Sequence, residues 1–271
     1  MADRLAASTN SYHGYSLEEA LAGISAAGFR SVELASVPGW TEHVTRDAAA
    51  AELDHLRALL KQHALTPVSL SGHSDLVTDE GMDQFRKALR LCRELGITMI
   101  TTSTGGHDAS SAGSLDHQRE EFLKRIGVLA DEAAQDGITI CLETHGGLLA
   151  TGVMSKALIQ RIGRGNVGIN YDAGNVIFYG DTDPLGDLPG AVDTVAHVHV
   201  KDKVGGAGVW NFPEVGTGEI DYAAIFRTLD AAGFDGPCSI EVEFDGTIPP
   251  LADVDRAMAG SYRHVRQFVP E

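Results

Sequence analysis

Cysteine is scarce in this sequence, and its scarcity excludes two classes of small protein. The 271 residues include three cysteines, Cys92, Cys141 and Cys238. The number is odd and no two of them have the close spacing of a thiolate metal site, so neither a disulfide scaffold nor a structural zinc module is expected. Cys92 falls in an expected helix and the other two fall in expected strands. We therefore predict reduced thiols in the core of a cytoplasmic protein.

Long apolar runs are also missing. No stretch approaches the roughly 20 apolar residues of a membrane-spanning helix. Residues Met1–Asn10 contain no apolar run of the kind that marks a secretory signal peptide. The sequence therefore predicts a protein that neither crosses nor binds a membrane.

Basic residues are outnumbered. Lysine and arginine total 21 against 38 aspartates and glutamates, which gives a formal net charge of −17. Nucleic acid carries dense negative charge and is bound through cationic side chains. The net charge therefore disfavours a polyanionic partner such as nucleic acid.

What the chain does contain is a regular alternation of short β-rich runs and longer helical patterns. The expected strands cover residues 5–8, 31–36, 67–72, 97–103, 138–143, 167–172, 196–202 and 238–244. The expected helices cover residues 16–27, 48–63, 80–95, 116–135, 154–162, 184–192, 222–232 and 254–268. Repeated βα units imply parallel strands, and eight of them in this length predict an α/β fold, a single-domain (β/α)8 TIM barrel over residues 1–271. The alternative is a doubly wound open sheet, which usually carries a glycine-rich first turn that Ser8-Thr9-Asn10-Ser11 does not provide.

The expected seventh strand has an unusual composition. Because strand side chains alternate, Val198 and Val200 point to one face while His197, His199 and Lys201 point to the other. In the other strands too, alternate residues are apolar, and we expect these side chains to point outward onto the helices: Val32, Leu34, Val68, Leu70, Ile140, Leu142, Ile169, Tyr171, Ile240 and Val242. The residues between them are mostly polar, and we expect their side chains to point into the barrel: Glu33, Ser69, Ser71, Cys141, Glu143, Asn170, Asp172, Ser239 and Glu241.

Several of these polar groups stand at the carboxyl ends of strands, where barrel active sites lie. Glu143, Asp172 and Glu241 are expected to converge there with His199. Two carboxylates 4 Å apart repel by roughly 4 kcal/mol at an effective dielectric near 20, so the cluster needs either protons or a divalent cation. Three carboxylates and one imidazole suit one Mn²⁺, Mg²⁺ or Co²⁺ ion, with Mn²⁺ preferred. Taken singly, each acid would as readily cap a helix or pair with a lysine.

These residues also carry a family likeness. The segments Cys141-Leu142-Glu143, Tyr171-Asp172, His197-Val198-His199-Val200-Lys201-Asp202 and Ser239-Ile240-Glu241 resemble the metal-binding strand ends of the xylose isomerase-like barrel superfamily. Within it, the sequence is most similar to sugar phosphate isomerases and epimerases, with ketose 3-epimerases and inosose isomerases and dehydratases nearby. The resemblance implies that Glu143, Asp172, His199 and Glu241 hold the metal. It further implies that Glu143 and Glu241 act as acid and base on a carbohydrate, and that the protein is a homo-oligomer, a dimer or tetramer.

The sequence departs from the ketose epimerases at two positions. They carry a histidine three residues after the metal-binding aspartate, where this chain has Asn175, and an arginine six residues after the metal-binding histidine, where it has Gly205. Both positions contact substrate in that group. The resemblance therefore implies the metal site but not 3-epimerisation of a free ketohexose. A phosphate site is equally unsupported, because neither an arginine cluster nor a glycine loop at a helix start is present.

Further residues are candidates for substrate binding, each with a structural alternative. His73, His107 and His145 follow strands three to five and suit hydrogen bonding or proton transfer, or are exposed loop histidines. Lys201 is expected to hold a substrate oxygen or to pair with Glu241 or Asp172. Glu33 either binds a sugar hydroxyl or is a structural acid. Asn175 stands where the epimerases have their substrate-binding histidine. Trp210 either stacks on a sugar ring or packs within its loop.

Four functions follow from this site. The first is a metal-dependent isomerase or epimerase of a sugar, keto-sugar or cyclitol that works through an enediolate. The second is a lyase or dehydratase that expels a β leaving group from a keto-inositol or 3-oxo-glycoside. A nuclease related to apurinic endonucleases is remote, because Trp210 and Phe212 stand where its extra metal ligands would be. A non-catalytic binding barrel would not need the four-ligand set.

Overall fold

The computed structural model describes residues 3–105 and 114–269, and these form a closed barrel of eight parallel strands in sequential order. The strands are β1 (Leu5–Ser8), β2 (Ser31–Ala35), β3 (Thr66–Ser71), β4 (Met99–Thr102), β5 (Thr139–Glu143), β6 (Val167–Asp172), β7 (Val195–Val200) and β8 (Cys238–Ile240). β1 pairs with β8 and closes the ring. The predicted (β/α)8 barrel is thereby confirmed, and the open sheet is excluded.

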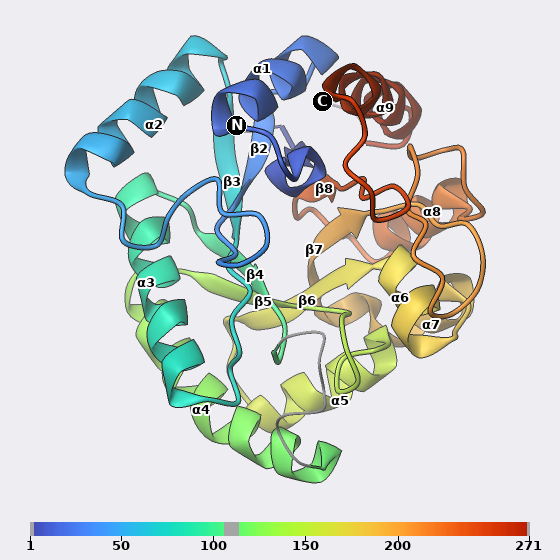
Figure 1. Ribbon diagram of the computed structural model, residues 1–271. Helices are drawn as coiled ribbons and strands as arrows, with labels where there is room; N and C mark the ends of the chain where they lie inside the picture. The colour runs from blue at the N-terminus through green and yellow to red at the C-terminus, as the bar shows by residue number, and fades with distance from the viewer. Residues whose placement is uncertain (1–2, 106–113, 270–271) are drawn as a thin grey trace.

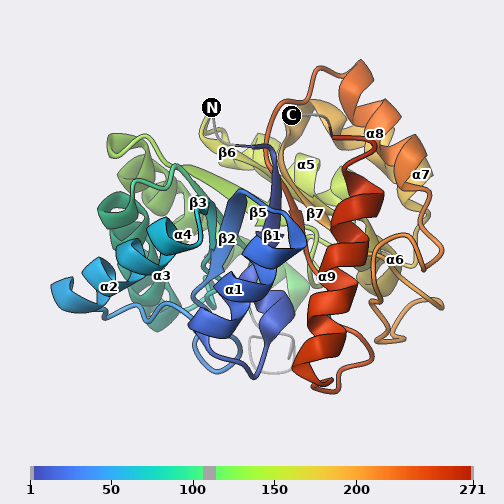
Figure 2. The same ribbon diagram turned by 90° about the horizontal axis from the view of Figure 1, so that it is seen from above.

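Helices surround the strands on all sides (Figure 1). They are α1 (Leu17–Ala27), α2 (Ala50–Gln62), α3 (Asp79–Leu95), α4 (Leu115–Gln135), α5 (Gly152–Ile162), α6 (Ala173–Gly180), α7 (Pro184–Ala191), α8 (Tyr222–Ala231) and α9 (Leu251–Val265). The first and last, α1 and α9, pack side by side and complete the outer layer (Figure 2). None of the helices in the described part of the chain is long and apolar enough to cross a membrane.

The helix boundaries follow from local chemistry that the sequence shows. Ser16 caps α1, and Glu19 closes the capping box by accepting a hydrogen bond from the Ser16 backbone. Gly28 ends that helix in the left-handed conformation, at φ 109°, and Gly96 ends α3 in the same way. These starts and stops lie within a few residues of the expected ones.

Two predicted features were wrong in detail. The predicted seventh and eighth strands extended to Asp202 and Phe244, whereas β7 ends at Val200 and β8 at Ile240. Glu241 still donates from its backbone N–H to the Val200 carbonyl over 3.1 Å, and farther on Phe244 forms an antiparallel bridge with Phe212. Helix α6 was not predicted, because the sequence Ala173–Gly180 is short and carries two glycines without an amphipathic pattern.

The predicted division between barrel interior and helix interface is confirmed. Outward side chains such as Leu34, Leu142 and Ile240 are fully buried in the apolar layer beneath the helices. Inward polar side chains bind one another across the barrel. Ser69 donates to Glu33 Oε2 over 2.8 Å, and His197 Nδ1 lies 2.9 Å from Asn170 Oδ1. The three cysteines are free and buried, as expected.

Candidate functional site

Four predicted ligands converge where the strands end. Glu143 ends β5, Asp172 ends β6, His199 lies near the end of β7 and Glu241 directly follows β8. One ligand atom from each lies within 4.8 Å of the corresponding atom of every other, and all four side chains are buried. The barrel therefore gathers three carboxylates and one imidazole in one place.

The imidazole of His199 occupies the centre of the cluster. Its Nδ1 atom lies 3.5 Å from Glu143, 3.6 Å from Glu241 and 3.9 Å from Asp172, measured to the nearest carboxylate oxygen. Nδ1 is buried and makes no hydrogen bond with the described residues. Asp172 Oδ2 also lacks a hydrogen bond, but it is ion-paired with Lys201 Nζ at 3.2 Å. A buried polar atom without a hydrogen bond is costly, so Nδ1, surrounded by three carboxylates, fits a position that binds a cation.

The other imidazole nitrogen is already engaged. His199 Nε2 lies 2.9 Å from Glu33 Oε1, at the centre of the barrel beneath the cluster. A carboxylate there favours a proton on Nε2, so Nδ1 is the nitrogen that would bind an ion shared with the three carboxylates. Glu33 is fully buried and is not part of the cavity wall, so its position supports the structural alternative over direct sugar binding.

Charge in the cluster is unbalanced. Burial raises the pKa of Asp172 to about 7, while Lys201 pulls it down and Glu143 pushes it up. Burial also opposes ionisation of Glu143, yet His199 and His73 hold the pKa of that carboxyl well below its usual value. Burial likewise opposes the charge on His199, but Glu33, Glu143 and Glu241 raise its pKa well above normal. A divalent cation would offset this surplus of carboxylates.

Lys201 provides part of the compensating charge. Its Nζ atom lies 2.5 Å from Glu241, 3.2 Å from Asp172 and 3.1 Å from Glu243. The predicted ion pair with Glu241 or Asp172 is thus present. Although burial lowers the pKa of Lys201, these carboxylates raise it well above its usual value, so the ammonium stays charged. Lys201 also borders the cavity, which leaves substrate contact as a prediction.

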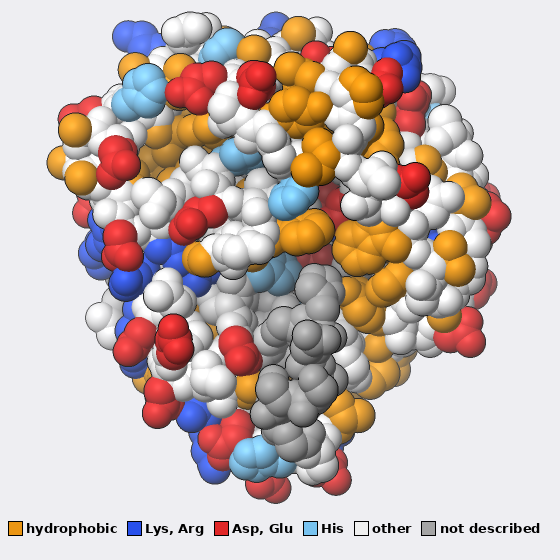
Figure 3. Space-filling view, in the orientation of Figure 1, with side chains coloured by type: hydrophobic (Ala, Val, Ile, Leu, Met, Phe, Trp, Pro, Cys, Tyr) orange, Lys and Arg blue, Asp and Glu red, His pale blue; other side chains and the backbone are white. Residues whose placement is uncertain are grey.

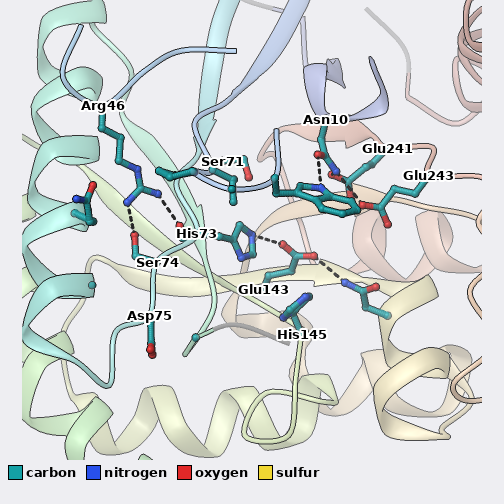
Figure 4. Close-up of a pocket in the computed structure, with 18 of the residues that line it drawn as sticks. Asn10, Arg46, Ser71, His73, Ser74, Asp75, Glu143, His145, Glu241 and Glu243 are labelled. Atoms are coloured by element: carbon teal, nitrogen blue, oxygen red, sulfur yellow. Dashed lines mark hydrogen bonds and ion pairs between the residues drawn. The ribbon is translucent and has the colours of Figure 1, made fainter. Parts of the chain in front are cut away.

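The ligand cluster opens into a cavity of about 560 Å³. In Figure 4 the labelled His73 points toward Glu143, with His145 nearby and Glu241 and Glu243 farther along. His73 Nε2 lies 2.9 Å from Glu143 Oε2, and the amide of Asn175 donates to the other Glu143 oxygen over 2.8 Å. Glu143 is therefore held by both oxygens. On the surface, histidine and apolar side chains surround a central hollow (Figure 3).

Aromatic rings form one side of the cavity mouth. Trp210 lies 6.4 Å from Trp40 and 5.6 Å from Phe178, measured between ring centroids. His145 Nε2 lies 3.0 Å from the Tyr179 hydroxyl. His145, Asn175 and Trp210 all border the cavity, and their contact with substrate stays a prediction. His107 lies outside the described residues.

The family model for xylose isomerase-like TIM barrels matches residues 21–264. The chain belongs to the xylose isomerase-like TIM barrel family. A sequence relative is the L-ribulose-5-phosphate 3-epimerase UlaE of Salmonella heidelberg (strain SL476), 28% identical over 190 residues. That match covers 69% of this chain and 65% of the relative, just under two thirds of its length.

Solved structures of this xylose isomerase-like fold superpose along nearly the whole chain. D-allulose 3-epimerase from Methylomonas sp. has a TM-score of 0.76 at 20% identity and covers 99% of this chain and 100% of its own. The IolI protein, solved with a bound zinc atom, has a TM-score of 0.78 at 18% identity and covers 98% and 97%. At these identities the likeness establishes the shared fold.

Several cavity residues of this xylose isomerase-like barrel were not predicted, and three of them bear on the ligand cluster or the cavity wall: Glu243, Asn10 and Arg46. Glu243 continues the inward parity of Ser239 and Glu241, so extending the alternation by two residues would have found it. Asn10 follows β1, and its amide donates to Glu241 over 3.0 Å and to Glu243 over 2.9 Å. Arg46 lies in the loop after β2, and no local pattern marks it. Its role depends on tertiary contacts alone.

Asp202 holds the segment Gly216-Thr217-Gly218, which lies between β7 and α8 in this xylose isomerase-like chain. Its carboxylate accepts hydrogen bonds from the backbone N–H groups of Gly216, Gly218 and Ile220, over 2.8, 2.9 and 3.2 Å. A Cβ atom at Gly218 would come within 2.3 Å of Asp202 Oδ1. Glycine is therefore required for the close approach, and Asp202 fixes the loop that leads to α8.

Proposed function

We propose that this protein is a divalent-metal-dependent isomerase or epimerase of a sugar, keto-sugar or cyclitol. The observation that carries the proposal is the buried cluster of Glu143, Asp172, His199 and Glu241, whose ligand atoms lie within 4.8 Å of one another. The names of the sequence relative and of the structural neighbours support the same reaction class.

The four ligands would hold one divalent ion, and Mn²⁺ is our first choice because the donors are mainly carboxylate oxygens, with Mg²⁺ or Co²⁺ as alternatives. Zinc is bound in the related IolI structure. Such an ion, when bound, polarises a carbonyl and its neighbouring hydroxyl and so acidifies the C–H bond between them.

The side chains of this chain supply the proton transfers. Glu143 and Glu241 come from β5 and from the residue after β8, and both border the cavity. One carboxylate removes the proton from the carbon next to the carbonyl, giving an enediolate, and the other returns a proton. His73 and Asn175 hold Glu143 in place, while Lys201 and Asn10 hold Glu241. Fixing both carboxylates lowers the cost of orienting them during reaction.

A lyase is the second candidate. The cavity continues well past the ligand cluster, toward Asp75 and Gln84, which leaves space for a departing group. The same enediolate would then expel a β substituent instead of regaining its proton. We further propose a homo-oligomer, a dimer or tetramer. The three buried free thiols favour the reducing cytoplasm as its compartment.

Deuterium exchange tests the reaction. Protein loaded with Mn²⁺ is incubated in D₂O with ketoses, inososes and 3-oxo-glucosides, and the products are analysed by mass spectrometry and, after metal removal, by NMR. Isomerisation predicts one deuterium at one carbon with the molecular formula retained, whereas elimination predicts loss of water or of the aglycone. Glu143→Gln and Glu241→Gln should each slow exchange by at least about 100-fold.

Two controls keep the test specific. Glu94→Gln alters an exposed helix residue away from the cavity and should exchange at the wild-type rate. The metal content of every variant is measured, so that a loss of the ion is separated from a loss of the acid or base. Absence of exchange and of elimination with every compound, in protein that retains its metal, would overturn the proposal.

A further inference from the structure

The cavity has a second end, far from the predicted metal ligands. We call this end the outer arm and define it by Val37, Pro38, Asp75, Thr78, Glu80 and Gln84. The loop after β2, the loop after β3 and the start of α3 supply these residues. In Figure 4, Arg46, Ser74 and Asp75 lie on the opposite side of the cavity from Glu241 and Glu243, with Glu143 between them.

We propose that the outer arm receives an uncharged, hydroxyl-bearing second group of the substrate, such as a second sugar ring. The substrate would then be an unphosphorylated sugar with a substituent rather than a sugar phosphate. This inference rests on the proposed function and narrows its substrate class. The first observation is the size of the cavity, because a volume of about 560 Å³ falls within the range that holds ligands larger than one monosaccharide.

Arg46 is the cationic side chain in the wall of this part of the cavity, and its N–H groups already bind other protein atoms. Arg46 is 2% exposed, and four of its five N–H groups are used within the protein. Nε and Nη2 both donate to the Ser36 carbonyl, Nη2 also donates to the His73 carbonyl, and Nη1 donates to Ser74 Oγ. Phosphate recognition by arginine uses a pair of parallel N–H groups, and Arg46 no longer offers such a pair.

The start of α3 is equally unsuited to an anion. A helix N-terminus attracts phosphate through its free N–H groups and its dipole. Here the first turn carries Asp79 and Glu80, and the Gly81 N–H is taken by Thr78 Oγ1 over 3.0 Å. Asp75 adds a third carboxylate nearby. A phosphate dianion in the outer arm would face like charges.

No other described cation is available to compensate. Lys201 is the remaining lysine or arginine that borders the cavity among the described residues, and three carboxylates surround it at 2.5 to 3.2 Å. The sequence of residues 106–113, GHDASSAG, adds neither lysine nor arginine. The cations near the cavity therefore serve the protein itself.

The same side chains suit a neutral sugar. Carboxylates accept hydrogen bonds from hydroxyl groups, and the Gln84 amide both donates and accepts. Trp40 is 45% exposed, stacks on His13 with a centroid distance of 4.3 Å and donates from Nε1 to Asn10 Oδ1 over 3.0 Å. Its ring is thus held in the cavity wall beside Asn10, which binds Glu241, and it offers an apolar face to a sugar that extends from the ligand cluster toward the outer arm.

Three matched ketoses test the inference. D-fructose, D-fructose 6-phosphate and isomaltulose differ only in the group on the same oxygen, which is a hydrogen, a phosphate or a glucosyl ring. The kcat/KM for deuterium incorporation from D₂O is measured with metal-loaded wild-type protein, and L-ribulose with L-ribulose 5-phosphate serves as a second pair. We expect isomaltulose to match or exceed fructose, and each uncharged ketose to exceed its phosphate at least tenfold.

Charge reversal in the outer arm provides the second readout. Glu80→Lys and the double variant D75K/E80K should raise kcat/KM for the phosphates relative to the uncharged ketoses at least fivefold. Glu94→Lys, with the same charge change elsewhere on α3, should leave that ratio unchanged. Glu80 is exposed, so the single variant is expected to fold even where the double variant does not.

The outcomes separate the two proposals. The inference is overturned if kcat/KM for a phosphate exceeds that for its uncharged partner, or if kcat/KM for the uncharged ketose exceeds that for its phosphate by less than tenfold. Either result leaves the proposed function standing. Failure of Glu80→Lys to change the ratio also counts against the inference. Absence of exchange with all five ketoses in metal-loaded protein overturns the inference. The proposed function falls with it only if the inososes and 3-oxo-glucosides of the first test also show neither exchange nor elimination.

Discussion

Glu33 lies directly behind His199, with Oε1 2.9 Å from Nε2, and both side chains are buried. The two residues come from β2 and β7 and meet across the barrel interior. A carboxylate in this position orients the imidazole and increases the basicity of its other nitrogen. Glu33 therefore acts on the predicted metal site through His199.

The first prediction concerns this pair. Glu33→Gln removes the charge behind His199, and outer contacts of this kind typically change metal affinity by about 10- to 100-fold. We expect Mn²⁺ to bind more weakly by that factor, as measured by calorimetry or competition with a chelator. Ser69→Ala removes a hydrogen bond to the other Glu33 oxygen and should have a much smaller effect. Wild-type affinity in Glu33→Gln would contradict the positioning role.

The second prediction concerns metal removal. An ion that binds only the folded protein stabilises it by about 2.7 kcal/mol at 100 times its Kd. At roughly 2–4 °C per kcal/mol, Mn²⁺ should raise the Tm of chelator-treated protein by about 5–10 °C. Asp172→Asn should lose most of this increase, whereas Glu94→Gln should keep it. An unchanged Tm in the wild-type protein would count against a metal site.

The third prediction concerns the loop that Asp202 holds. The buried Asp202 carboxylate accepts three hydrogen bonds from that loop, and hydrogen bonds to charged groups contribute about 1.5–3 kcal/mol each. Asp202→Ala should lower the free energy of unfolding by at least about 3 kcal/mol in urea titrations. Asp202→Asn keeps one acceptor oxygen and should lose less. A change below about 1 kcal/mol would show that the loop is held by other contacts.

The fourth prediction concerns alkaline pH. Burial raises the pKa of four of the six tyrosines above its ordinary value near 10: Tyr12, Tyr171, Tyr179 and Tyr222. Because the folded pKa is the higher one, this contribution to stability is present below pH 10 and is lost as the pH rises above the value of the unfolded chain.

Absorbance at 295 nm checks this expectation. At pH 11 the native protein should show ionisation of at most two tyrosines, and the urea-unfolded protein should show all six. The free energy of unfolding should fall between pH 10 and pH 11. Ionisation of four or more phenols in a protein that remains folded, as judged by circular dichroism, would contradict it.

The barrel and the convergence of four inward side chains were predictable because both follow from period-two alternation. The alternation of polar and apolar residues within each strand indicates which side chains face inward, and parallel strands bring their carboxyl ends to the same end of the barrel. Glu143, Asp172, His199 and Glu241 could therefore be placed in one cluster without tertiary information. The ends of β7 and β8 could not, because a strand ends where its neighbour stops pairing with it, whereas the predicted ends of β5 and β6 were correct.

Other parts of the site depend on contacts between distant segments. Asn10 meets Glu241 across 231 residues of sequence, and Arg46 is positioned by carbonyls of two different loops. Neither residue has a local signature, because its partners are set by how the loops pack. Glu243 is the exception, since its inward parity was readable and the alternation needed only one further step.

Asp172 serves two structures at once. Its Oδ1 atom accepts a hydrogen bond from the Asn175 N–H at the start of α6, while Oδ2 faces His199 and Lys201. Helix α6 in turn carries Asn175, Phe178 and Tyr179 toward the cavity. Lengthening this side chain by one methylene, as in Asp172→Glu, would shift the helix start and the ligand together. The tolerance of the site for exchange between the two acids is therefore set by the backbone of α6 as well as by the ion.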